Sequence, residues 1–185
     1  MKITVLIPYF GKWPAWLPFT LHSIRFNPGI HWVFFTDCGR PDNAPENTTF
    51  IEISYADYCR LVSQRLNIPF APTSPYKLCE IKPALGFIHQ DLLADSDYWA
   101  FSDIDLVYGD LLGSFSHVLG HKDVIATHRT RISGHFCLLR NTAPMDALFK
   151  QVPDWQQHFC SPELAVFDER HFSRLFIGRK NFPEP

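Results

Sequence analysis

The sequence predicts an α/β fold in which helices cover both faces of a mainly parallel sheet. Short segments rich in β-branched and aromatic residues form continuous apolar runs, which is typical of strands that are buried on both faces. Between these runs lie segments whose apolar residues recur at helical spacing, so strands and helices alternate along the chain. A length of 185 residues suits one domain, and we expect residues 1–185 to form it.

In the first half of the chain, the expected elements are separated by proline, glycine or asparagine. The first strand ends at Pro8 and Gly11, and the helix after it is stopped by the turn Asn27-Pro28-Gly29. Apolar residues at positions i, i+3, i+4 and i+8 mark the buried face of a second helix. The expected elements are strands at residues 3–7, 30–36 and 50–53, and helices at 14–26 and 58–66.

A loop with three prolines, residues 68–75, opens the second half of the chain. Pro83 suits the first turn of a helix whose buried face we expect to carry Leu85, Ile88 and Leu92. The strand after that helix is rich in aromatic residues and leads directly into a pair of aspartates. The remaining expected elements are strands at residues 98–101, 124–127 and 136–139, and helices at 143–150 and 170–176.

Composition and missing motifs exclude several classes of protein. The net charge is −2 and no polybasic stretch occurs, so we expect no nucleic-acid partner. Five widely spaced cysteines without a C-x-x-C pair argue against a disulfide framework or zinc knuckle and favour the cytoplasm. The N-terminal apolar run is too short for a signal peptide or a membrane span. The motifs of dinucleotide oxidoreductases, P-loop enzymes, common serine hydrolases and zincins do not occur.

Asp-x-Asp occurs twice, and position separates the two pairs. Asp95-Ser96-Asp97 lies at the amino end of a strand and is expected to be a solvated turn. Asp103 and Asp105 follow the same strand at its carboxyl end, where parallel sheets bind ligands. Two residues apart on extended backbone, these carboxylates point to the same side and repel each other unless a cation lies between them. Mg²⁺ or Mn²⁺ with a diphosphate ligand would satisfy them, whereas the alternative is a pair of acids that cap a helix near Gly109-Asp110.

The run YWAFSDIDLVYGDL, residues 98–111, resembles the Asp-x-Asp segment of GT-A fold glycosyltransferases. It is most similar to small bacterial transferases of capsule and lipopolysaccharide assembly. The run TVLIPYFGKW, residues 4–13, resembles the first strand and nucleotide loop of the same fold. The likeness covers most of residues 1–176, is strong around 98–111 and is loose after 130. It implies a GT-A, Rossmann-like three-layer α/β/α sandwich.

The resemblance also implies roles for individual residues. Metal ligands for Mn²⁺ or Mg²⁺ would be Asp103 and Asp105. The catalytic base for the acceptor hydroxyl would be Asp168 or Glu169, although an acidic pair equally suits the start of a helix at 170–176. The nucleotide-sugar contacts would come from Pro8, Tyr9, Phe10, Asp37, Lys82, Asp103, Ile104, Gly134 and His135.

The function implied is transfer of a sugar from a nucleoside-diphosphate sugar, with UDP favoured, to a hydroxyl of a glycan or lipid-linked glycan in envelope polysaccharide synthesis. Such an enzyme would work in the cytoplasm, and association with the inner face of the membrane is compatible with this role. One alternative is a non-catalytic GT-A-like protein that binds nucleotide or glycan, or a partner subunit, because no obvious further metal ligand follows His171 and the chain would then be minimal or truncated. A haloacid-dehalogenase-type phosphatase is the second alternative.

Overall fold

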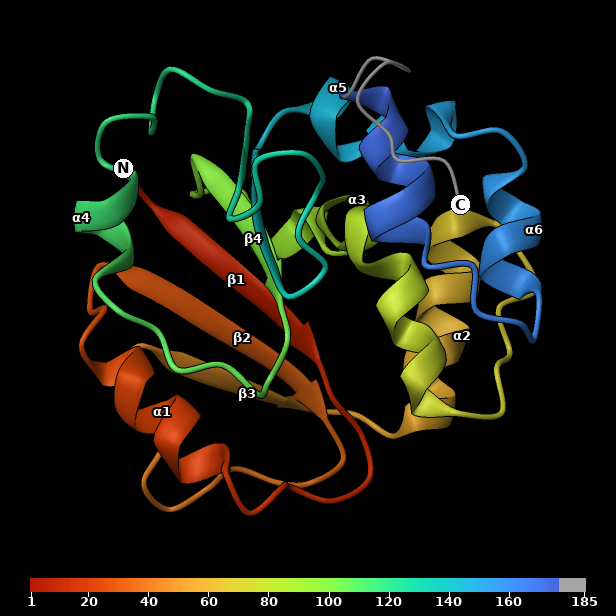
Figure 1. Ribbon diagram of the computed structural model, residues 1–185. Helices are drawn as coiled ribbons and strands as arrows, with labels where there is room; N and C mark the ends of the chain where they lie inside the picture. The colour runs from red at the N-terminus through yellow and green to blue at the C-terminus, as the bar shows by residue number, and fades with distance from the viewer. Residues whose placement is uncertain (177–185) are drawn as a thin grey trace.

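The computed structural model describes residues 1–176 as a six-stranded sheet with helices packed on both of its faces (Figure 1). The strands are β1 (Ile3–Pro8), β2 (Ile30–Thr36), β3 (Thr48–Glu52), β4 (Tyr98–Ser102), β5 (Val124–Ala126) and β6 (Phe136–Arg140). The α-helices are α1 (Leu17–Arg25), α2 (Tyr55–Leu66), α3 (Leu85–Ile88), α4 (Leu111–Phe115), α5 (Ala143–Asp146) and α6 (Trp155–Cys160). The 3₁₀-helical segments are η1 (Pro75–Ala84), η2 (Gln90–Leu92), η3 (Leu148–Gln151) and η5 (Ser173–Leu175), and η4 (Phe167–Phe172) is a π-helical turn.

The sheet is mainly parallel, as the sequence predicts. Its strand order is β3-β2-β1-β4-β6-β5, and the first four strands run in the same direction. β6 is antiparallel to both of its neighbours, β4 and β5. The chain leaves β1 toward β2 on one side, while β4 lies on the other side, so the strand order reverses between β1 and β4. In open α/β sheets such a reversal leaves a crevice beyond the carboxyl ends of the two strands.

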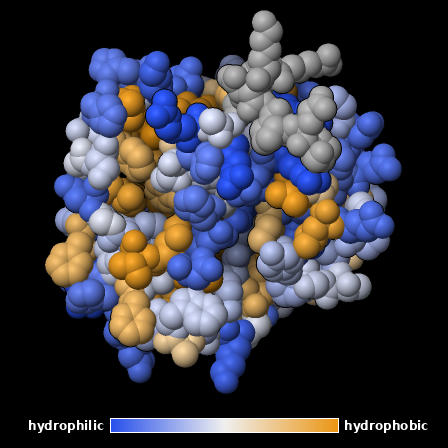
Figure 2. All heavy atoms as spheres, viewed as in Figure 1, coloured by the Kyte–Doolittle hydropathy of each residue, from blue (hydrophilic) through white to orange (hydrophobic). Residues whose placement is uncertain are grey.

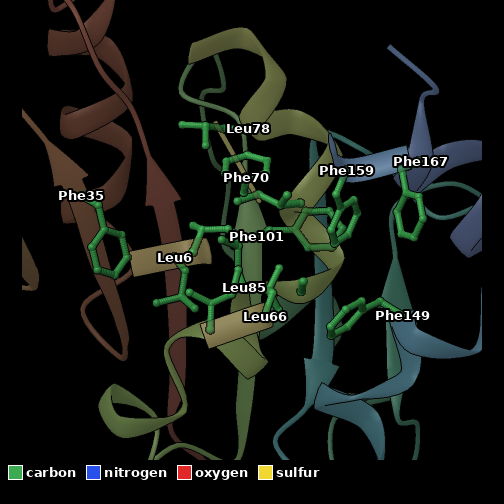
Figure 3. Close-up of a cluster of buried hydrophobic side chains, with 14 of the residues drawn as sticks. Leu6, Phe35, Leu66, Phe70, Leu78, Leu85, Phe101, Phe149, Phe159 and Phe167 are labelled. Carbon is green, nitrogen blue, oxygen red and sulfur yellow. The ribbon is translucent and has the colours of Figure 1, made fainter. Parts of the chain in front are cut away.

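Alternating side chains of the strands enter two separate hydrophobic clusters, one on each face of the sheet. Val5 packs on the face covered by α1 and by the segment 104–119, whereas Leu6 packs on the face covered by α2, η1, α3, α6 and η4. Figure 3 shows the second cluster, in which Phe101 of β4 lies among side chains from η1, α3 and the C-terminal helices. Burial on both faces explains why the strands read as continuous apolar runs.

In the segment between α2 and β4, the predicted helix start and one predicted buried side chain are wrong. The helical turns begin at Pro75 rather than near Pro83, because the Ser74 side chain accepts a hydrogen bond from the Tyr76 amide and caps a 3₁₀ segment there. Pro83 therefore lies inside η1. Leu92 is 43% exposed and not buried as predicted, because α3 ends at Ile88 and the following turn η2 changes the helical register. Leu93 occupies the core instead.

The C-terminal helix predicted at residues 170–176 begins three residues earlier, at Phe167, as the π-helical turn η4. The acidic pair Asp168-Glu169 thus lies in the first turn of a helix, where negative charge is favourable. None of the helices within residues 1–176 is long and apolar enough to cross a lipid bilayer.

A close contact between Trp99 of β4 and Gly86 of α3 joins the sheet to the helices above it. The Trp99 side chain is completely buried, and its Nε1 donates a 2.7 Å hydrogen bond to Oδ1 of Asp146. A Cβ atom added at Gly86 would overlap the Trp99 indole ring. Glycine is therefore required at this position by the close approach of strand and helix.

Gly86→Ala is expected to lower the free energy of unfolding by about 1–3 kcal/mol, because the extra methyl group must displace the Trp99 ring. Gly109→Ala is the matched control, since an added Cβ at Gly109 meets no atom within 4 Å. Urea denaturation of both variants measures the difference. Equal stability of the two variants would contradict the proposed close packing.

Candidate active site

Residues from four distant segments of the chain meet beyond the carboxyl ends of β1 and β4, and we call this region the crevice. Asp103 directly follows β4, and its backbone N–H donates to the carbonyl oxygen of His135 at 2.9 Å. His135 precedes β6, whose antiparallel direction brings its first residue opposite Ser102 at the end of β4. Lys82 of η1 and the acidic pair of η4 complete the group. Because β6 runs antiparallel to β4, the residues just before it, Gly134 and His135, lie beside the Asp-x-Asp motif.

Lys82 forms the centre of this group. Its ammonium forms an ion pair with Oδ1 of Asp103 and donates a 2.8 Å hydrogen bond to the carbonyl oxygen of Gly134. Burial lowers the pKa of Lys82, but the nearby Asp103 and Cys79 raise it more, so the net pKa is raised. Lys82 therefore remains a cation in a largely buried position. Burial raises the pKa of the neighbouring Cys79 thiol, which stays protonated at neutral pH.

Gly134 packs directly against the acidic pair. Its N–H donates to Oε1 of Glu169 at 3.2 Å, and a Cβ added at Gly134 would lie 2.7 Å from Oδ2 of Asp168 and 3.0 Å from Oε1 of Glu169. Only a residue without a side chain allows both carboxylates to approach this backbone. Gly134, Asp168 and Glu169, each singled out from the sequence, are therefore neighbours in the structure.

Asp168 and Glu169 differ in their surroundings. Asp168 is buried, and desolvation raises the pKa of its carboxyl to about 6, while Lys82 opposes the shift. Its Oδ1 accepts a 2.8 Å hydrogen bond from the Glu169 amide. The Glu169 side chain is more open and lies 3.6 Å from Nε of Arg131. Asp168 is therefore the carboxyl group that can exchange a proton near neutral pH.

Two further buried charges of η1, whose structural roles the sequence does not reveal, hold the chain that precedes the acidic pair. The Glu80 carboxylate accepts hydrogen bonds from the amides of Ala165 and Val166 at 2.9 Å and from the amide of Phe167 at 3.2 Å. Nζ of Lys77 donates to the carbonyl oxygens of His158 at 2.9 Å and Glu163 at 2.6 Å. Nothing in the local sequence signals these roles, because charged residues in a loop-like segment are normally exposed.

The loops after β1 and β2 form a second part of the crevice. Oδ1 of Asp37 accepts a 2.7 Å hydrogen bond from the Gly11 amide, which ties the two loops together. The rings of Tyr9 and Trp13 are stacked, with centroids 5.2 Å apart. Phe10 does not face this region, because its ring is buried in the core between Tyr55 and Tyr58. Of the predicted nucleotide contacts in this loop, Tyr9 presents a partly exposed ring and Phe10 does not.

The remaining predicted site residues border the crevice. Pro8, at the end of β1, is partly exposed. The carbonyl oxygen of Ile104 accepts a 2.8 Å hydrogen bond from Oγ1 of Thr20, which fixes the backbone between the two aspartates. His135 is exposed, and its Nε2 lies 2.8 Å from Oγ1 of Thr127. Asp105 is also exposed.

The carboxylates of Asp103 and Asp105 suit one mode of metal binding only. Within residues 1–176, no group of three or more His, Cys, Asp or Glu side chains is arranged to hold a metal ion. One oxygen of Asp103 is already paired with Lys82, and no residue within 1–176 pairs with Oδ2. Mg²⁺ and Mn²⁺ commonly bind through one or two carboxylates together with phosphate oxygens of a substrate. The residues present fit this substrate-assisted mode rather than a closed protein cage.

Asp168→Asn is expected to stabilise the protein above about pH 6 by roughly 1–3 kcal/mol and to give no gain near pH 4. Folding raises the pKa of the Asp168 carboxyl to about 6. As the pH rises from the pKa of this group in the unfolded chain to about 6, its ionisation therefore lowers the free energy of unfolding. Asparagine removes this cost and keeps the oxygen that accepts from the Glu169 amide. Urea denaturation at several pH values, with exposed Asp95→Asn as control, measures the effect. A pH-independent loss of stability would contradict it.

The chain was compared with known proteins. It matches one protein family from residue 5 to residue 183, and that family is described as a "Family of unknown function (DUF6625)". No curated protein matches the chain. The match includes every segment that contributes to the crevice, from the loop after β1 to the acidic pair of η4. Because it spans nearly the whole sequence, this chain belongs to family DUF6625.

Proposed function

We propose that this protein is a glycosyltransferase of the GT-A type that moves a sugar from a nucleoside-diphosphate sugar to a glycan hydroxyl. One observation carries the proposal: Asp103, Lys82, Gly134 and Asp168-Glu169 meet in the crevice where the strand order reverses. These residues come from four segments far apart in the sequence. Their types are those needed to bind a diphosphate and to accept a proton.

The donor would lie across the carboxyl ends of β1, β2 and β4. The stacked rings of Tyr9 and Trp13 provide a flat surface for a nucleotide base. The second carboxylate oxygen of Asp37, which accepts no hydrogen bond from the part of the chain that the structure describes, would bind a ribose hydroxyl. Pro8, Ile104 and His135 would line the path between base and sugar. Resemblance to capsule and lipopolysaccharide transferases favours UDP as the nucleotide, an envelope glycan or lipid-linked glycan as the acceptor, and a cytoplasmic location.

The diphosphate gains negative charge as its bond to the anomeric carbon breaks. Lys82 supplies a fixed positive charge beside Asp103 to stabilise that charge, in a position shielded from water. Asp103 and Asp105 would hold Mn²⁺ or Mg²⁺, which when bound supplies Lewis-acid stabilisation of the leaving diphosphate. Because Lys82 is tethered to Gly134 as well as Asp103, it needs no reorganisation during the reaction.

The acceptor hydroxyl must lose its proton as its oxygen bonds to the anomeric carbon. Asp168 is suited to accept that proton, because its pKa of about 6 lies close to the working pH of a cytoplasmic enzyme. Glu169 is more exposed and pairs with Arg131, so its role is to orient the acceptor and the Gly134 backbone. A base in this role corresponds to direct displacement, with inversion at the anomeric carbon.

Calorimetric titration tests the proposal. UDP, GDP, CDP and ADP are added to the purified chain with Mn²⁺, with Mg²⁺ and with chelator. We expect one nucleotide to bind in a metal-dependent way and to stabilise the fold by about 2.7 kcal/mol at a hundredfold excess over its dissociation constant. Asp105→Ala should abolish the metal-dependent binding, whereas Asp95→Ala, in the other Asp-x-Asp pair, should bind like the parent protein.

The outcomes separate the alternatives. Metal-dependent binding together with release of sugar from the matching nucleotide sugar, lost in Asp168→Asn, supports an active transferase. Binding without any turnover by the parent protein supports a non-catalytic nucleotide-binding protein. Failure of all four nucleotides to bind, with or without metal, would contradict both readings of the crevice.

A further inference from the structure

The backbone of the Asp-x-Asp motif is held by buried hydroxyl groups. Ser102 and Tyr108, which lie on either side of the motif in the sequence, are both buried, and their hydroxyl oxygens are 2.6 Å apart. Each hydroxyl also reaches the carbonyl oxygen of Asp103, that of Ser102 at 3.1 Å and that of Tyr108 at 3.3 Å. Two hydroxyl groups therefore converge on the backbone of the first aspartate of the motif.

The next carbonyl group of the motif is held from α1. Oγ1 of the buried Thr20 donates to the carbonyl oxygen of Ile104 at 2.8 Å. Further along the chain, Nδ2 of Asn27 donates to the carbonyl oxygen of Gly109 at 2.9 Å, and its Oδ1 accepts from the Leu111 amide at 3.0 Å. In Figure 1 the segment between β4 and α4 accordingly runs beside α1, over one face of the sheet. Both ends of this segment are thus fastened to the same helix.

Packing alone does not explain why residue 108 is a tyrosine. The Tyr108 ring lies against Trp32 and Phe136, with ring centroids 5.7 Å and 6.0 Å apart, in the apolar cluster that Ile104 and Leu106 also join. Figure 2 shows the outside of this region, where apolar residues lie among polar ones. A phenylalanine ring would fill the same space. A buried hydroxyl is unfavourable unless it is hydrogen-bonded, and the partners of this one are Ser102 and the Asp103 backbone.

These contacts fix the two peptide groups that join the two aspartates. The carbonyl of Asp103 belongs to the first of these groups and the carbonyl of Ile104 to the second. Two carboxylates in such proximity repel each other, so a backbone that could rotate would turn them apart. With both peptide groups hydrogen-bonded, the direction of Asp103 relative to Asp105 is set by the protein itself, in the absence of any cation.

We propose that Tyr108 is a positioning residue for the metal ion, which holds the Asp103 carbonyl so that the carboxylates of Asp103 and Asp105 are aligned before Mn²⁺ or Mg²⁺ binds. Ser102 relays this effect, and Thr20 has the same role at the Ile104 carbonyl. Groups that orient metal ligands without touching the metal have large effects on metal affinity. The inference rests on the proposed function, because it concerns the metal ion of that reaction.

Tyr108→Phe tests the proposal, because it removes the hydroxyl and keeps the ring. Mn²⁺ is titrated by calorimetry into the full chain with an excess of whichever of UDP, GDP, CDP and ADP binds the parent protein. We expect the dissociation constant of Mn²⁺ to rise about tenfold or more. Excess Mn²⁺ should restore full occupancy, because both metal-binding carboxylates remain.

Tyr98→Phe is the matched control. Tyr98 is completely buried in the same apolar cluster, at the other end of β4, and its hydroxyl donates to the carbonyl oxygen of Lys122 at 2.6 Å and accepts from the Gly120 amide at 3.0 Å. This variant also loses a buried hydroxyl, so urea denaturation should show a loss of stability similar to that of Tyr108→Phe. Its dissociation constant for Mn²⁺ should equal that of the parent protein.

Hydrogen exchange without metal provides a second readout. The Asp103 amide donates to the carbonyl oxygen of His135 at 2.9 Å, beside the Ser102 hydroxyl, and should exchange faster in Tyr108→Phe than in Tyr98→Phe. Thr20→Val removes the other hydroxyl that holds the motif and keeps the shape of the side chain. It should also weaken Mn²⁺ binding, and it provides the test if Tyr108→Phe does not fold.

The outcomes distinguish this inference from the proposed function. If the parent protein binds Mn²⁺ with a nucleotide, and Tyr108→Phe and Thr20→Val bind it equally tightly, the positioning role is overturned and the proposed function stands. An equal loss of affinity in Tyr98→Phe would also overturn the positioning role, because affinity would then follow the stability of the fold. Absence of metal-dependent nucleotide binding by the parent protein would overturn the proposed function and the positioning role together.

Discussion

Three charged side chains of η1 are buried, and each is satisfied by a different part of the chain. Lys82 bridges Asp103 and the carbonyl oxygen of Gly134, Glu80 accepts three amides just before η4, and Lys77 donates to two carbonyl oxygens around α6. A buried charge is unfavourable unless it is paired or hydrogen-bonded, so these contacts are obligatory. The irregular segment η1 therefore determines where the C-terminal third lies relative to the sheet.

This arrangement explains how a crevice at a sheet edge becomes a site. The sheet alone supplies Asp103 and the loops after β1 and β2, because the carboxyl ends of parallel strands share one edge. The acidic pair of η4 reaches the same place only because Glu80 anchors the preceding residues and Gly134 leaves room for both carboxylates. The raised pKa of Asp168 follows from its burial there. Holding the ionised Asp168 carboxylate away from water therefore lowers the stability of the fold.

The sequence predicts the regular parts of this protein well and its irregular parts poorly. β2 begins and ends where its apolar run does, at Ile30 and Thr36. The sheet edge and Asp103 could be located because strand ends are visible in the sequence. Glu80 could not be identified, since its burial depends on amides more than eighty residues away. Leu92 was misassigned because helical periodicity was extended through a segment where the helix is broken.

Glu80 positions the acidic pair, and hydrogen exchange in the variant Glu80→Ala measures this role. The amides of Ala165, Val166 and Phe167 lose their acceptor in this variant. Since a hydrogen bond to a charged group contributes about 1.5–3 kcal/mol, their exchange should accelerate roughly tenfold or more, while the amide of Val5 in β1 exchanges as before. Unchanged exchange at the three amides, or equal acceleration throughout the sheet, would show that Glu80 does not position the acidic pair.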